Sequence, residues 1–246
     1  MRIAVIADIH GNLRAFEAVQ ADLQAQSPDL VVNLGDHLSG PLQAAATAEA
    51  LMATGYIHIR GNHDRQLLDR SVDAMGPSDR AAHARIDDRH RGWLRQLPAT
   101  YEVGPGILLC HGSPSSDLAY LLENVNPNGR YIASAEEVLA RIGDVRPALL
   151  LCGHTHIPRA IRTGQVLIVN PGSVGLQAYD DDVPVRHYME NGSPHARYAI
   201  LDRKGSDWRV SFIAVEYDWH AASKEAAAAD RPDWAHALAT GYALRS

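Results

Sequence analysis

Short apolar segments alternate with longer segments of helical spacing in the first quarter of the chain. Residues 2–7, 29–34 and 56–60 are short, largely apolar runs that end at polar residues, as expected of buried strands. Apolar residues recur at helical spacing over residues 13–25, and a second helix is predicted over residues 41–54. The order strand, helix, strand, helix, strand predicts parallel strands joined by right-handed crossovers.

The remainder of the chain is predicted to contain further strands, a helical insertion and a helical tail. Residues 65–96 are polar and are predicted to form the helical insertion, in two pieces divided near Gly76-Pro77. The tail over residues 219–238 is predicted to be helical with an interruption at Pro232, and residues 177–195 are predicted to form a long polar loop. A strand at 148–152, a turn at 126–129, and hairpins at 101–103 with 107–110, 160–162 with 166–169 and 197–201 with 208–215 complete the prediction. Without a repeat or a linker in the sequence, residues 1–246 are predicted to form a single domain.

Candidate chemistry follows five of the predicted strands. The motifs are Asp8-x-His10, Gly35-Asp36, Gly61-Asn62-His63-Asp64, His111 and Gly153-His154-Thr155-His156. Functional groups collect beyond the carboxyl ends of parallel strands, so these side chains are expected to meet. Any one motif alone is more often a solvated or capping group. Together, the carboxylate, carboxamide and imidazole donors suffice for two metal sites, with one histidine left for acid chemistry.

In this order, the five motifs resemble those of the calcineurin-like metallophosphoesterase superfamily. The stretch Asn170-Pro-Gly-Ser-Val-Gly175 and the helical tail look like the small bacterial and archaeal phosphodiesterase branch of that superfamily. The resemblance spans nearly the whole chain. It implies an α/β fold in which two packed mixed sheets are flanked by helices, a four-layer sandwich.

The resemblance also implies a dinuclear metal centre. One ion would be held by Asp8, His10, Asp36 and His156, and the second by Asp36, Asn62, His111 and His154, with Asp36 as the bridging ligand. Such oxygen and nitrogen donors suit two divalent ions, manganese first, with iron, nickel or zinc as alternatives. A hydroxide that bridges the two ions would act as the nucleophile.

Four further residues are candidates for catalysis or substrate binding. The resemblance makes His63 a non-ligand that stabilises developing charge or protonates the leaving oxygen. Asp64 would either orient His63 or cap a helix. His37 and Arg60 are candidate substrate contacts, with a buried structural histidine and a structural ion pair as the respective alternatives.

Composition limits the classes of partner and the location. The 246 residues carry a net charge of −6, which argues against a nucleic-acid partner, because phosphate-backbone binding needs clustered Lys and Arg. The two cysteines, Cys110 and Cys152, lie in apolar runs and are predicted to be buried, reduced thiols. No apolar run approaches the roughly 20 residues of a membrane helix, so a cytoplasmic protein without membrane contact is expected.

The predicted function is metal-dependent hydrolysis of small phosphodiesters or nucleotides. A phosphomonoesterase with the same dinuclear centre is one alternative, and a metal-poor protein-binding scaffold of the same fold is another. All five motif histidines are present, which favours an enzyme, because scaffolds of this superfamily tend to lose them. The continuation His37-Leu38-Ser39-Gly40 differs from the Asp-Arg-Gly of protein Ser/Thr phosphatases. The sequence does not predict the oligomeric state.

Overall fold

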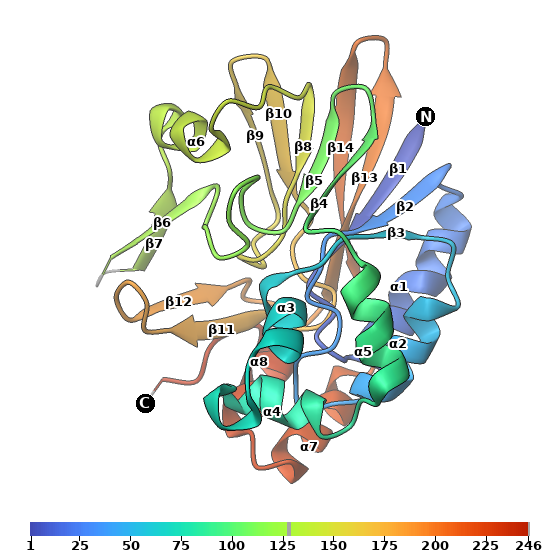
Figure 1. Ribbon diagram of the computed structural model, residues 1–246, viewed down its shortest axis with the longest axis vertical. Coiled ribbons are helices and arrows are strands. Elements are labelled where there is room, and N and C mark those ends of the chain that lie inside the picture. The colour runs from blue at the N-terminus through green and yellow to red at the C-terminus, as the bar shows by residue number, and fades with distance from the viewer. Residues whose placement is uncertain (127–128, 246) are drawn as a thin grey trace.

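The computed structural model describes residues 1–126 and 129–245, and two five-stranded mixed sheets lie at its centre (Figure 1). The first sheet contains β1 (Arg2–Ile6), β2 (Leu30–Asn33), β3 (Ile57–His58), β13 (Ala196–Lys204) and β14 (Asp207–Val215), in the order β14-β13-β1-β2-β3. The second contains β4 (Thr100–Gly104), β5 (Ile107–Cys110), β8 (Leu149–Leu151), β9 (Arg159–Thr163) and β10 (Val166–Asn170), in the order β4-β5-β8-β10-β9. In each sheet three neighbouring strands are parallel, β1-β2-β3 and β5-β8-β10, and the other strands are antiparallel to their neighbours.

Helices cover the outer faces of the sheets and gather at one end of them. They are α1 (Leu13–Gln26), α2 (Ala44–Met52), α3 (Asn62–Asp69), α4 (Pro77–His83), α5 (Asp88–Gln96), α6 (Ala135–Ile142), α7 (Trp219–Ala228) and α8 (Pro232–Thr240), with a 3-10 turn at Val72–Ala74. Figure 1 shows α1 and α2 beside the first sheet, α6 on the far side of the second, and α3, α4, α7 and α8 near the carboxyl ends of β1 and β2. The predicted α/β sandwich of two mixed sheets flanked by helices is confirmed.

Both faces of each central strand are buried, which explains why these strands are apolar throughout rather than alternating. In β1, Ile3 and Val5 enter the core between the two sheets, whereas Ile6 points the other way and packs with the residues of α1. In β8, Leu151 enters the inter-sheet core, and Leu150 packs on the opposite face with residues of α6. The layers are therefore helix, sheet, sheet, helix, and polar residues appear only where the strands end.

The predicted hairpins are confirmed as β4-β5, β9-β10 and β13-β14. The segment 65–96 is helical as predicted and breaks before Pro77, but it contains parts of three α-helices, α3, α4 and α5, rather than two pieces. The tail forms α7 and α8, with Pro232 as the first residue of α8. The grouping of the whole chain into one domain stays a prediction. The predicted turn at 126–129 includes residues 127–128, which lie outside the described residues.

The prediction of a long loop over residues 177–195 is wrong. In this segment β11 (Ala178–Asp181) pairs antiparallel with β12 (His187–Glu190). Elsewhere in the chain, β6 (Glu123–Asn126) pairs with β7 (Gly129–Ile132) as a second small antiparallel pair. Three consecutive aspartates hide the alternation of β11 in the sequence. Tertiary packing stabilises the hairpin β11-β12 although its local sequence pattern does not predict it, because Tyr179 and Tyr188 pack against the apolar cluster that contains Trp234 of α8.

Cys110 and Cys152 are buried free thiols, in agreement with the sequence-based prediction. Over the described part of the chain, every helix is too short or too polar to span a membrane.

Candidate functional site

The seven predicted metal ligands meet at the carboxyl ends of the strands. Six of them form two clusters of ligand atoms, and within each cluster these atoms lie within 4.8 Å of one another; the clusters are Asp8, His10 and His156, and Asp36, His111 and His154. The seventh, Asn62, begins α3 directly beside the second cluster. The division into two groups is the one that the family resemblance implies. The role of these residues as ligands stays a prediction.

Asp36 faces both clusters. Its Oδ2 lies 3.2 Å from Nε2 of His111 and 3.9 Å from Nε2 of His10. Its Oδ1 accepts a hydrogen bond of 2.9 Å from the backbone N–H of His63, which fixes the carboxylate plane. This is the position that a carboxylate bridging two ions would need.

Backbone carbonyls orient the two imidazoles of the first cluster. Nδ1 of His10 lies 2.9 Å from the carbonyl oxygen of Ser39, and Nδ1 of His156 lies 2.7 Å from that of Leu176. A carbonyl oxygen only accepts, so Nδ1 carries the proton in each ring and Nε2 presents a lone pair. Burial lowers the pKa of His10 to about 4, so this ring is neutral at pH 7.

The second cluster is oriented in the same way. Nδ1 of His111 lies 2.8 Å from the carbonyl oxygen of Leu34, and Nε2 of His154 lies 3.2 Å from that of Leu118. The opposite ring nitrogens, Nε2 of His111 and Nδ1 of His154, face the cluster. The side-chain amide of Asn62 reaches both of these nitrogens at 3.0 Å and Asp36 Oδ2 at 3.3 Å. Metal-binding histidines commonly have their second nitrogen held by a backbone carbonyl, as these four are.

The spacing of the donor atoms fits divalent cations. The Nε2 atoms of His10 and His156 lie 3.1 Å apart, and with both Nδ1 atoms protonated their lone pairs point at each other. Such a contact is repulsive unless a proton or a metal cation lies between the nitrogens. Two donors held about 2.1 Å from one ion at right angles are about 3.0 Å apart, which matches this spacing. Oδ2 of Asp8 is also buried without a hydrogen-bond partner among the described residues.

Burial and neighbouring charges shift the pKa values of these groups in different directions. Burial alone would raise the pKa of the Asp36 carboxyl, but the imidazoles of His111 and His63 hold this pKa well below its usual range. Burial would lower the pKa of His111, but Asp36 and Asp8 raise it to about 10. Burial lowers the pKa of His154 to about 3. The clusters therefore combine carboxylates with neutral imidazoles and one imidazole whose Nε2 can hold either a proton or a metal ion.

Five of the seven predicted ligands have backbone conformations that L-residues seldom adopt. Their φ angles lie between 53° and 69°, and they belong to Asp8, His10, Asp36, His154 and His156. Each such residue typically costs about 1–3 kcal/mol and persists only where the surrounding structure enforces it. This concentration of strain marks these strand ends as a functional site.

His63 is held by an aspartate that the sequence analysis missed. Its Nδ1 lies 2.7 Å from Oδ1 of Asp79, a buried residue in the first turn of α4, and the same Oδ1 accepts a 2.6 Å hydrogen bond from Ser39. Burial would lower the pKa of the His63 imidazole, but the carboxylates of Asp36 and Asp79 outweigh it and raise this pKa to about 9. His63 is therefore protonated at neutral pH, and its side chain is 31% exposed toward the pocket described below. Acidic residues are common in the first turn of a helix, so nothing in the sequence indicates that Asp79 contacts His63.

Asp64 does not orient His63, and that prediction is corrected. Its carboxylate accepts hydrogen bonds from the backbone N–H groups of Asp36, His37 and Gly61, at 2.9, 3.0 and 2.9 Å, and pairs with Nδ1 of His37 at 2.7 Å. By accepting from the N–H of Gly61 it caps the start of α3, and it ties the loop after β2 to the loop after β3. Asp64 is thus a support for Asp36 rather than a partner of His63.

The two predicted substrate contacts lie away from the pocket. His37 is fully buried and packs its ring against Trp93 and His58, so its structural alternative is correct. Arg60 is half-buried, its backbone N–H donates to the carbonyl of Pro98 at 2.7 Å, and it is not part of the pocket lining. His37 follows Asp36 and Arg60 precedes Gly61 in the chain, but neither residue lines the pocket.

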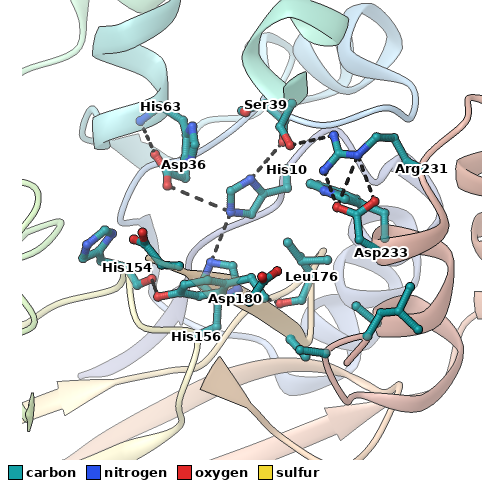
Figure 2. Close-up of a pocket in the computed structure, with 18 residues that line it drawn as sticks. His10, Asp36, Ser39, His63, His154, His156, Leu176, Asp180, Arg231 and Asp233 are labelled. Atoms are coloured by element: carbon teal, nitrogen blue, oxygen red, sulfur yellow. Dashed lines mark hydrogen bonds and ion pairs between the residues drawn. The ribbon is translucent and has the colours of Figure 1, made fainter. Parts of the chain in front are cut away.

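An enclosed pocket of about 250 Å³ opens onto the clusters (Figure 2). Four predicted ligands and His63 form one part of its wall, and Figure 2 shows Arg231 and Asp233 of the C-terminal region on the opposite side. Apolar residues complete the lining, among them Leu176, Trp234 and Leu244. The sequence analysis missed these residues, because a tail of small and apolar residues indicates a helix but not what the helix faces.

Comparison with known proteins agrees with this site. A family model described as the calcineurin-like phosphoesterase superfamily domain matches residues 1–191. An uncharacterized protein of Methanocaldococcus jannaschii is 26% identical, and the match covers 94% of both chains.

Two solved structures are similar over nearly the whole chain. A metallophosphoesterase from Sphaerobacter thermophilus is 27% identical with a TM-score of 0.75, and the match covers 98% of this chain and 99% of that one. A hypothetical protein from Pyrococcus horikoshii is 20% identical with a TM-score of 0.73, and the match covers 98% of each chain. Both matches extend over the C-terminal helices of this chain, which the family model does not reach.

Replacing Asp79 by Asn tests the electrostatic control of His63. In the metal-free protein, Asp79→Asn should lower the pKa of His63 from about 9 toward its ordinary value near 6.5, because a carboxylate partner is lost. The stabilisation that Asp79 gives to the imidazolium is complete below pH 6.5 and is lost as the pH rises through about 9. NMR titration of the imidazole protons measures the shift. Asp233→Asn, a carboxylate on the opposite wall, is the control and should leave this pKa unchanged.

Replacing Asp36 by Asn tests its position between the clusters. The variant should lose most of both ions, because the carboxylate faces both sets of donors and an amide cannot serve two ions as well. Elemental analysis after reconstitution with Mn²⁺ measures the metal content per chain. Asp180→Asn changes a pocket carboxylate outside the clusters and should retain the wild-type content. Full metal content in Asp36→Asn would contradict the bridging position.

Proposed function

Because the chain belongs to the calcineurin-like phosphoesterase superfamily, we propose that it hydrolyses small phosphodiesters at a centre of two divalent metal ions. Family membership identifies the protein as a metal-dependent phosphoesterase. The number of ions, the metal, the preferred ester and the roles of the residues are our proposal. The observation that supports it most strongly is the pair of donor clusters that share Asp36.

In this proposal, Asp8, His10, Asp36 and His156 hold one ion, and Asp36, Asn62, His111 and His154 hold the other. When bound, two divalent ions neutralise charge on the phosphoryl oxygens and lower the pKa of water enough to make a nucleophile at neutral pH. The donors are carboxylate, amide and imidazole groups, for which we propose manganese first and iron, nickel or zinc as alternatives. Both cysteines are buried in the apolar core beside β5 and β8, so their thiols are not part of the donor set.

His63 supplies the acid in this proposal. Asp79 holds Nδ1, which leaves Nε2 as the nitrogen available to a substrate in the pocket. The carboxylate of Asp79 raises the pKa of this imidazole and so favours its protonated form, which can donate to a leaving alkoxide of higher proton affinity. Asp79 and Ser39 position the ring, and His63 delivers the proton to the leaving oxygen.

The charge of the pocket favours a diester over a monoester. Carboxylates of Asp180, Asp181 and Asp233 line it, and the guanidinium of Arg231 is paired with Asp233 at 2.6 Å. A phosphate monoester carries a charge of about −1.5 to −2 at pH 7, whereas a diester carries a single negative charge. The carboxylates repel the monoester more strongly. We also propose a small-molecule substrate rather than a nucleic acid, because the net charge of the chain is −6.

Two p-nitrophenyl esters test the proposed function directly. With Mn²⁺ bound, kcat/KM for bis-p-nitrophenyl phosphate should exceed that for p-nitrophenyl phosphate by about tenfold or more. A preference for the monoester would replace this proposal with a phosphomonoesterase. Failure to bind metal together with failure to hydrolyse either ester would leave the protein-binding scaffold.

The leaving group tests the role of His63. His63→Ala should retain its metal but hydrolyse methyl phenyl phosphate roughly 10²–10⁴-fold more slowly, because phenolate needs a proton as it leaves. Methyl p-nitrophenyl phosphate should be affected less, because p-nitrophenolate is a more stable anion. Steady-state rates for both esters measure this difference, with His220→Ala as a control histidine outside the pocket. Equal losses for the two esters would contradict an acid role.

A further inference from the structure

A second hollow lies next to the metal clusters. It is an open groove of about 760 Å³, lined by residues of α3, of the segment from Leu118 to Val125, and of the hairpin β11-β12. Asn62 forms part of its wall, and the groove shares His63 and Asp181 with the enclosed pocket. His63 and Asp181 therefore lie at the boundary between the two hollows, and Asn62, beside the second cluster, connects the groove to the metal clusters.

The two hollows differ in size and access. Binding sites for drug-sized ligands are typically about 300–1,000 Å³, so the enclosed pocket of about 250 Å³ suits only a small group, whereas the groove of about 760 Å³ can take a large one. A phosphorus atom held at the boundary has space for one substituent on each side. A monoester has a single organic substituent and would leave one space empty.

The rim of the groove is apolar. Leu118 is 54% exposed and Val183 is 71% exposed, and both line the groove together with Pro184 and Tyr120. Exposed apolar side chains gathered at a concave surface mark a site for an apolar or aromatic ligand group. The guanidinium of Arg141 at the inner wall donates to the carbonyl oxygens of residues 120, 121 and 123, so its hydrogen bonds are used within the protein. The lining also includes the exposed Arg70 and the carboxylates of Glu123 and Asp181, so the groove combines an apolar rim with charges of both signs rather than a cluster of cations.

We infer that this groove binds the larger organic arm of the phosphodiester, an uncharged group with an aromatic face such as a nucleoside, while the enclosed pocket takes the smaller arm. The inference rests on the proposed diesterase function and adds that the two organic groups of the substrate differ in size. The contact that determines specificity is made by Val183 and its neighbours on the rim, which lie outside the metal clusters.

Two diesters with the same leaving group test the inference, thymidine 5′-(p-nitrophenyl phosphate) and methyl p-nitrophenyl phosphate. Val183→Asp places a charge on the rim and should raise KM for the thymidine ester by about tenfold. The larger arm of the methyl ester is the p-nitrophenyl group, which is smaller than a nucleoside, so its KM should rise by a smaller factor, and both kcat values should not change. Val183→Ala should also raise KM for the thymidine ester, but by a smaller factor, because it removes apolar area without adding charge. Ile132→Asp is the matched control, since Ile132 is 55% exposed and does not line the groove.

Binding provides a readout that does not depend on turnover. Calorimetry should show that adenosine 5′-monophosphate binds the metal-loaded Val183→Asp protein about tenfold more weakly than the wild type, and inorganic phosphate equally well. The inference is overturned if Val183→Asp leaves KM for the thymidine ester unchanged, or changes KM for both esters equally, in a protein that still hydrolyses diesters. Absence of diester hydrolysis in the wild type would instead remove the proposed function on which the inference rests.

Discussion

The site depends on one constraint: donor atoms from the ends of the two sheets are held facing one another at short range. Backbone carbonyls of residues 34, 39, 118 and 176 take the N–H of four imidazoles and so force the other nitrogen of each ring toward the centre. Lone pairs and carboxylates held at such short range repel one another, and positive charge at that point is what makes the arrangement favourable. Affinity for cations is therefore set by the backbone as much as by the ligands.

Holding these donors in place strains the strand ends, and tight loop packing maintains the strain. A Cβ on Gly61 would collide with the carboxylate and backbone of Asp36, and one on Gly175 would collide with the carbonyl of Ile9. Ser173 donates to the carbonyl of Asp8 at 2.7 Å and thereby ties the loop after β10 to the loop after β1. Because both sheets are buried on two faces, the molecule has enough apolar packing to tolerate left-handed residues at its functional end.

The sequence predicts the layers and the metal clusters because both follow from local patterns. An apolar run followed by Asp8 or Asp36 reports a buried strand and the group at its carboxyl end in a few consecutive residues. Asp79, Arg231 and Trp234 carry no such pattern, since their positions depend on how helices pack after the sheets have formed. For the same reason the sequence left Asp64 between two roles, orienting His63 and capping a helix, of which the structure supports the cap. Its neighbour in sequence, His63, points into the pocket, while its own carboxylate turns back to three backbone N–H groups.

The residues that the sequence predicts and those that it does not predict have different proposed chemical roles. The proposed metal ligands stand on strand ends, whose geometry is fixed by the sheets. The residues proposed to hold the acid, or to surround the organic parts of a substrate, come from α4, α8 and the hairpin β11-β12, which pack around that end. These outer elements can change in length and composition without disturbing the donor clusters, because their side chains reach the site from outside. In the proposed function, substrate selection is accordingly a property of the helices and hairpins, whereas the type of reaction is a property of the sheets.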